Sequence, residues 1–410
     1  MKILYVARRY WPAVGGVETY LRQLATELGS RHELTVLASR IDDGAHTRLS
    51  DSLRPPKPFT AFRDGPVHVK PLTVPAHRRL LTAPLLAHVT PGLRRYAYGR
   101  SRPLAASLVA RAVAPAIAQE ARGADVIHMW AGDLLASAAV RAGELAGVPV
   151  VITPFAHRGQ WGYDSASLRA YDAAARTIAL LETEAHLYEE FGIDRARIDV
   201  LGVCSAGVLA TDRDEARRRL GVDGPLVLFL GARREYKGFD LLLQAAPAVS
   251  ASHPAATFAF VGPGSALSDV PDGARVLDVG AVDEAHKALW LNAADVLCLP
   301  SAAEILPGSI LEAWSVGTPV LTSDIPPLVE LVDGASAGRH VARQPEAIAR
   351  TLIEMLDDPA RLREMGARGR EAWQYRFTVE AVARLHEETY SLARHVRAAP
   401  AADRAAALAV

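Results

Sequence analysis

Three things are scarce in this chain of 410 residues: a surplus of one charge, cysteine, and long apolar runs. The 46 basic residues balance 46 acidic ones, so no overall imbalance points to a nucleic-acid partner. The two cysteines, Cys204 and Cys298, form neither a metal-binding nor a redox spacing, which predicts a reducing compartment. The best apolar run, residues 104–118, is broken by Arg111 and is too short for a membrane span. We therefore expect a cytoplasmic protein.

Buried strands alternate with amphipathic helices along most of the chain. The first repeat is a strand at residues 2–7, a glycine turn at 11–16 and a helix at 17–30. Continuous apolar strands of this kind are typical of a parallel sheet covered on both faces. The pattern restarts after residue 205, which predicts an α/β fold of two doubly wound halves. Ligands of such sheets bind at the carboxyl ends of the strands.

One long segment is expected to be helical throughout. Residues 175–192 are expected to form this helix, and a strand-like run follows at residues 198–203. The polar segment that comes next is expected to be a linker with a leading helix. The alanine-rich end of the chain, residues 396–410, predicts a disordered tail.

Two glutamates stand eight positions apart in an otherwise apolar or small stretch, "EILPGSILE". A buried carboxylate needs a partner, because an uncompensated buried charge costs several kcal/mol. Ser309 and Glu312 fit a capping box, so Glu312 has either a structural or a ligand-binding role. Glu304 has no such local partner. The helix start at residues 308–310 offers backbone N–H groups suited to phosphate, so the stretch predicts a nucleotide-sugar site.

The run at residues 300–324 resembles the donor-site signature of retaining glycosyltransferases of family 4. That signature is a glutamate, seven residues, a second glutamate, a helix of small residues and G-x-P-V. Four further blocks are similar to the same family in the same order, and five ordered blocks make the resemblance specific. These blocks cover residues 10–28, 125–157, 226–247 and 279–301.

The resemblance implies the GT-B fold, in which two Rossmann-like domains face each other across a cleft. Residues 1–205 would bind the acceptor and residues 206–375 the nucleotide-sugar donor. A helix near residues 376–395 would pack back on the first domain. The family needs no obligatory metal and no cofactor. Asp212–Asp214 matches a metal motif of a different fold, but it lies in the expected linker and is interpreted as helix-start charge.

The resemblance also assigns roles to residues. It implies catalytic roles for Glu304 at the donor sugar hydroxyls, His157 at the donor sugar, and Lys237 with Arg233 at the diphosphate. Positive charge there would stabilise the leaving diphosphate. Ala232 stands where the family has its arginine, so the sequence leaves open whether Arg233 or Arg234 substitutes. The implied donor-binding set is Gly15, Gly16, Arg233, Arg234, Lys237, Gly262, Glu304, Gly308, Ser309, Ile310 and Glu312.

Some of these residues also have purely structural interpretations. Pro307 replaces a family glycine and lacks an N–H group. Gly15 and Gly16 could form a simple turn. His128, at a strand end, is a weaker catalytic alternative to His157.

Residues 65–119 contain no aspartate or glutamate. Such a run is usually a solvated face. It could instead attract an anionic membrane surface or a phosphate-bearing acceptor, which would place the protein at the inner face of the membrane. The basic residues in it are Lys70, Arg78, Arg79, Arg94, Arg95, Arg100, Arg102 and Arg111.

We therefore expect a retaining, metal-independent transferase that moves a hexose-type sugar from a UDP- or GDP-linked donor. The acceptor could be a lipid-linked saccharide, a polysaccharide precursor or a small molecule. One alternative is another GT-B enzyme, such as a nucleotide-sugar epimerase or a pseudo-glycosyltransferase. Another is a non-catalytic protein that binds nucleotide sugars. A dehydrogenase is disfavoured, because the dinucleotide glycine fingerprint is absent.

Overall fold

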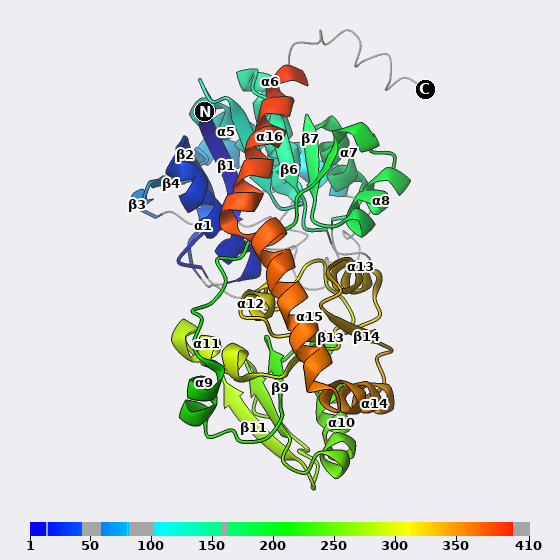
Figure 1. The fold of residues 1–410 in the computed structure, drawn as a ribbon. Coiled ribbons are helices and arrows are strands. Elements are labelled where there is room, and N and C mark those ends of the chain that lie inside the picture. The colour runs from blue at the N-terminus through cyan, green and yellow to red at the C-terminus, as the bar shows by residue number, and fades with distance from the viewer. Residues whose placement is uncertain (14, 43–58, 80, 82–101, 157–161, 397–410) are drawn as a thin grey trace. The chain divides into compact units, whose positions relative to one another are not determined.

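The chain folds into two compact units, shown in the computed structural model of Figure 1. The first comprises Met1–Leu201 together with Val382–Val410, and the second comprises Gly202–Ala381. The expected tail lies, from residue 397 onward, outside the described residues. The residues that the structure describes are 1–13, 15–42, 59–79, 81, 102–156 and 162–396.

An eight-stranded sheet forms the centre of the first unit, in the order β3-β4-β2-β1-β5-β6-β7-β8. Its paired strands are parallel except β3 and β4. The strand order reverses direction between β1 and β5. The strands are β1 (Lys2–Arg9), β2 (Glu33–Arg40), β3 (Phe62–Asp64), β4 (Val67–Pro71), β5 (Val126–Trp130), β6 (Val150–Thr153), β7 (Arg176–Ala179) and β8 (Ile198–Val200).

Helices surround this sheet and bury apolar stripes against it. Helix α1 buries Leu21, Leu24 and Leu28 completely, as the helical spacing in the sequence predicts. The described helices of this unit are α1 (Gly16–Gly29), α2 (Ala76–Arg79), α5 (Arg102–Glu120), α6 (Leu134–Ala146), α7 (Ser165–Ala173), α8 (Glu182–Glu190) and most of α16 (Val379–Val396).

A six-stranded sheet in the order β11-β10-β9-β12-β13-β14 forms the second unit. All of its pairs are parallel. This is the doubly wound order of a dinucleotide-type sheet, with its switch point between β9 and β12. The strands are β9 (Leu226–Leu230), β10 (Thr257–Val261), β11 (Arg275–Gly280), β12 (Val296–Leu299), β13 (Val320–Ser323) and β14 (Gly338–Val341).

Helices cover this second sheet as well. The two units together confirm the predicted α/β fold class of two doubly wound parallel sheets. The described helices are α9 (Arg213–Leu220), α10 (Phe239–Ser252), α11 (Glu284–Ala293), α12 (Gly308–Ser315), α13 (Pro326–Ala335), α14 (Pro345–Leu356) and α15 (Pro359–Ala372).

The predicted helix at residues 175–192 was wrong. The structure divides it into strand β7, which pairs with β6 and β8, and the short helix α8. Thr177 and Ile178 are buried and β-branched, which suits a central strand. A short apolar run of this kind has no periodicity that separates a buried strand from a helix.

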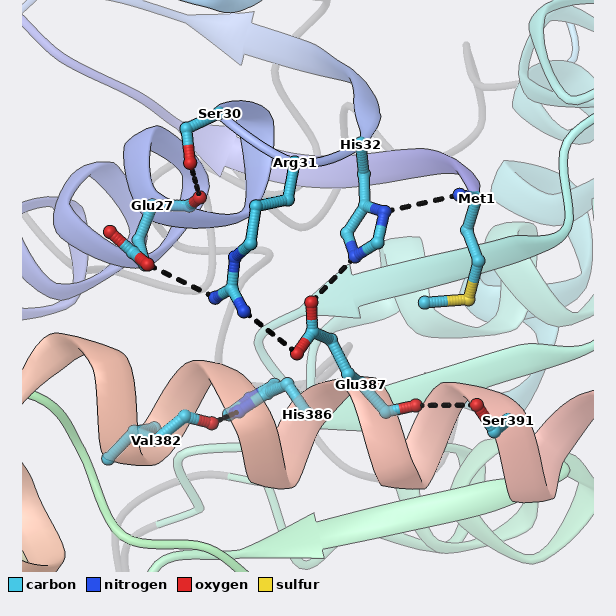
Figure 2. Close-up of polar contacts among 9 residues, drawn as sticks. All are labelled: Met1, Glu27, Ser30, Arg31, His32, Val382, His386, Glu387 and Ser391. Atoms are coloured by element: carbon cyan, nitrogen blue, oxygen red, sulfur yellow. Dashed lines mark hydrogen bonds and ion pairs between the residues drawn. The ribbon is translucent and has the colours of Figure 1, made fainter.

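Helix α16 is joined to the first unit by a small polar cluster, which Figure 2 shows. Glu387 accepts hydrogen bonds from His32 Nε2 at 2.7 Å and from Arg31 Nη1 at 3.1 Å. The amino group of Met1 lies 3.2 Å from His32 Nδ1, which can accept its hydrogen bond. Arg31 also binds Glu27 on α1. The cluster thus connects α16 to α1 and to the start of the sheet.

Candidate functional site

The loops at the carboxyl ends of β9, β10 and β12 bring several predicted site residues together at the switch point of the second sheet. The loop after β9 carries Arg233 and Lys237, and the loop after β12 carries Glu304. Gly262 directly follows β10, and α12 begins at Gly308. Doubly wound sheets bind their ligands at this place, so the position agrees with a ligand site.

Lys237 and Glu304 form an ion pair with each other. Lys237 Nζ lies 2.5 Å from Glu304 Oε1, and the two side chains are 18% and 8% exposed. The Lys237 ammonium also lies 5.3 Å from the centre of the Tyr236 ring. Glu304 therefore has a partner that its sequence neighbours did not reveal. The pair joins one cation and one anion of the site across 67 residues of sequence.

A set of backbone contacts fixes these two loops against each other. Ser301 Oγ donates to the Lys237 carbonyl at 3.5 Å, and Arg343 Nε donates to the Pro300 carbonyl at 3.0 Å. Gly238 has φ 70°, and a Cβ on it would lie 2.2 Å from the Pro300 oxygen. Only glycine combines this conformation with this approach.

Gly238→Ala should therefore destabilise the second unit by about 2 kcal/mol more than Gly221→Ala, because a backbone clash adds to an unfavourable φ. Gly221 is a matched control, since it has φ 65° and open space around its Cα. Urea unfolding of both variants measures the difference. Equal losses would show that the Pro300 contact imposes no constraint.

The two candidate arginines differ in their surroundings. Arg233 is 4% exposed, pairs with Asp278 at 2.5 Å, and directs Nη2 to the Gly262 carbonyl at 3.3 Å. Arg234 is exposed, and its side chain has no hydrogen bond or ion pair with the described residues. Neither follows the strand glycine directly, because Ala232 takes that place.

The capping box, one of the two interpretations that the sequence left open for Ser309 and Glu312, does not form. Helix α12 begins at Gly308, its N-cap is Pro307, and no side chain caps it. Proline with φ −75° fits this boundary, which makes Ser309 the second helical residue and removes it from the cap. The Ile310 N–H bonds to the Pro307 carbonyl at 3.1 Å. No side chain therefore caps the N–H groups in the first turn of α12.

Glu312 has a different partner, Lys287 on α11. Lys287 Nζ lies 2.7 Å from Glu312 Oε1 and 2.7 Å from Glu284 Oε2. Burial raises the pKa of Glu312, and the Lys287 ammonium opposes this rise. The sequence did not single out Lys287, because it looks like an ordinary helix lysine 25 residues away from Glu312.

The glycines of the first unit lie at the start of α1. Gly15 is the N-cap, and a Cβ on it would lie 2.1 Å from Glu18 Oε2. Glu18 in turn accepts a hydrogen bond from Arg9 Nε at 2.7 Å. Open space surrounds Gly16. In the structure, Gly15 makes room for the Arg9–Glu18 pair, a requirement that the sequence did not predict.

The two histidine candidates have different outcomes. His157 lies outside the described residues. His128 is completely buried in β5, where its ring nitrogens bond to Tyr390 Oη at 2.7 Å and to Thr153 Oγ1 at 2.8 Å. Burial and the neighbouring His386 hold the pKa of His128 well below its usual value. His128 is a core residue.

Part of the basic run has local partners. Lys70 pairs with Glu120 at 2.8 Å, and Arg78 Nη1 donates to the Arg111 carbonyl at 3.4 Å. Among the residues that the structure describes, no helix is both long and apolar enough to cross a membrane. Arg94, Arg95 and Arg100 lie outside the described residues, as do the side chains of Arg79 and Arg102.

Comparison with known families settles the classification. The family described as "Glycosyl transferase 4-like domain" matches residues 15–204, and "Glycosyl transferases group 1" matches residues 224–358. The chain belongs to this glycosyltransferase family. The resemblance inferred from its motifs is confirmed.

Two individual relatives share 35% and 27% sequence identity with this chain over the matched residues. A D-inositol 3-phosphate glycosyltransferase of Acidothermus cellulolyticus is 35% identical over 240 residues, which are 51% of this chain and 52% of that protein. The match thus spans about half the length of this relative. The glycogen synthase of Mycobacterium tuberculosis is 27% identical, with 96% of this chain and 95% of that protein covered.

A solved structure supports the fold. Anabaena HepE in complex with UDP has a TM-score of 0.68 and 18% identity, with 95% of this chain and 100% of that chain covered. At this identity the likeness concerns the fold alone. It confirms that this group 1 glycosyltransferase has the GT-B fold.

Proposed function

We propose that the chain is a retaining glycosyltransferase that transfers a hexose-type sugar from a UDP- or GDP-linked donor. The observation that carries the proposal is the Lys237–Glu304 pair beside the uncapped start of α12, at the β9–β12 switch point. Glu304 binds hydroxyls of the donor sugar, and Glu312 binds the ribose. Lys237 and the N–H groups of Gly308 and Ser309 bind the diphosphate.

The chemistry follows from where negative charge develops. As the bond between the anomeric carbon and the diphosphate oxygen breaks, the leaving group gains charge, which Lys237 and the α12 dipole stabilise. The acceptor hydroxyl forms its new bond on the same face of the sugar, and a donor phosphate oxygen takes its proton. We propose that this arrangement uses no metal ion and no resident cofactor.

Donor and acceptor would be divided between the two units. The second unit binds the nucleotide sugar, and the first binds a lipid-linked saccharide, a polysaccharide precursor or a small molecule. The chain is similar to enzymes named for glycosyl transfer to inositol phosphate and for glycogen synthesis, and this similarity supports sugar transfer to such an acceptor. The structure of HepE with UDP supports a uridine donor. We propose that the protein is cytoplasmic and that basic residues within 70–111 bind an anionic membrane surface.

Binding of the free nucleotide is the first test. A thermal-shift screen against UDP, GDP, ADP and dTDP without added metal should show one clear winner. At 100 times its Kd, that nucleotide should add about 2.7 kcal/mol to the free energy of unfolding. Glu312→Ala and Lys237→Ala should each clearly reduce the shift. Four nucleotides without any shift would contradict the donor site.

A non-catalytic nucleotide-sugar-binding protein is the second candidate. It is favoured by the arrangement around Arg233, whose charge is already balanced by Asp278. The Ala232 substitution and the absence of an N–H on Pro307 also remove groups that the family uses. Slow hydrolysis of the donor by the purified protein would exclude this candidate, and tight binding without any hydrolysis would support it.

A further inference from the structure

Lys287 occupies a central place among the charged groups that surround Glu312. Its ammonium lies 2.7 Å from Glu312 Oε1 and 2.7 Å from Glu284 Oε2. The Lys287 side chain is 16% exposed, Glu312 is 22% exposed, and Glu284 is 87% exposed. The lysine thus connects a carboxylate at the site with one at the protein surface. It comes from α11, and neither the sequence motif around Glu304 and Glu312 nor the set of implied site residues includes it.

The two oxygens of the Glu312 carboxylate have different surroundings. Oε1 accepts the hydrogen bond from Lys287. Oε2 has no hydrogen-bond partner within the described residues. A carboxylate can accept on both oxygens, so one of them remains available to a ligand. The positive charge of the lysine also opposes the rise that burial causes in the pKa of Glu312.

We propose that Lys287 is a positioning residue for the ribose of the nucleotide donor. It holds Glu312 through Oε1, so that Oε2 accepts a hydrogen bond from a ribose hydroxyl. The proposal rests on the proposed function, because it requires Glu312 to bind the ribose. It adds a residue that acts through Glu312 and not through its own contact with the donor. The opposite arrangement, in which Lys287 competes with the ribose for Glu312, makes the opposite prediction.

The test compares nucleotides with and without ribose hydroxyls. Isothermal titration would measure Kd for UDP, GDP and their 2′,3′-dideoxy analogues with wild type, Lys287→Met and Lys287→Arg. Lys2→Met serves as a control, because Lys2 pairs with Glu33 at 3.4 Å at the surface of the first unit. Urea unfolding of each variant would show that it is folded.

For the nucleotide that wild type prefers, Lys287→Met should weaken binding about tenfold, because a charge-assisted hydrogen bond to the ribose loses its support. Removal of the ribose hydroxyls should weaken binding to wild type by a similar factor and to Lys287→Met much less. Lys287→Arg should keep most of the affinity, and Lys2→Met all of it. This coupling between a lysine and a ligand hydroxyl would not arise from a general loss of structure.

Each remaining outcome has one meaning. Unchanged or tighter binding by Lys287→Met overturns the proposal while the donor site stands. Equal losses for the ribose and dideoxy nucleotides also overturn it, because the lysine would then act elsewhere. If wild type binds neither UDP nor GDP, the proposed function itself fails.

Discussion

Glu304→Gln should reduce sugar transfer by about two to three orders of magnitude and leave nucleotide binding nearly unchanged. The amide keeps the shape of the carboxylate but loses its charge, so the charge-assisted hydrogen bonds to the donor sugar are weakened where the transition state needs them. The UDP or GDP part of the donor would still bind to Lys237, Glu312 and the start of α12. The defect should therefore appear in kcat and not in the affinity for the free nucleotide.

Folding should be affected only slightly by this change. Lys237 Nζ lies 2.5 Å from Glu304 Oε1, and the glutamine oxygen can still accept that hydrogen bond. Glu304→Ala should also abolish transfer, but it leaves the lysine without a partner. A suitable control is Glu354→Gln, because Glu354 forms an exposed pair with Arg339 in the same unit. Wild-type turnover in Glu304→Gln would contradict the assignment of Glu304.

The architecture was predictable because its signal is local. Apolar strands and amphipathic helices have different periods, and each can be recognised within ten or twenty residues. One exception was β7, in which Thr177, Ile178 and Ala179 are all buried. A strand covered on both faces has no alternation, so its pattern resembles that of a buried helix. Only its pairing with β6 and β8 distinguishes the two.

The site was predictable in part, for a related reason. A carboxylate in an apolar stretch is conspicuous in a sequence, which is why Glu304 and Glu312 could be singled out. Their partners could not be found in this way, because Lys237 and Lys287 are 67 and 25 residues distant. The capping box does not form because the serine and glutamate spacing is also compatible with a helix that begins two residues earlier, at Gly308 after Pro307.

The core of the first unit should lose stability in acid, because it contains two neutral buried histidines. His386 is completely buried, which lowers its pKa from 6.5 to about 4. Burial lowers the pKa of His128 as well. In the unfolded chain both titrate near pH 6.5, so between that pH and their folded pKa values the unfolded state binds more protons. Stability therefore falls as the pH falls through this range, by about 3 kcal/mol for His386 alone.

One buried carboxyl acts in the opposite direction over much of the same range. Burial raises the pKa of Glu184 from 4.5 to about 7, so the folded state binds more protons there and gains stability on acidification. The pH profile of the wild type alone cannot separate these contributions. The difference between wild type and His386→Phe can, since Glu184 is present in both.

We expect the stability of wild type relative to His386→Phe to fall by about 3 kcal/mol between pH 7 and pH 4. His395→Gln is the matched control, because His395 is exposed on the same helix. Its profile should run parallel to that of wild type. Urea unfolding at each pH gives all three curves. A His386→Phe curve parallel to wild type would mean that His386 is protonated as easily in the folded protein as in the unfolded chain. The tight packing of α16 against Tyr20 and Trp130 would then have to admit a charged imidazole, which its burial argues against.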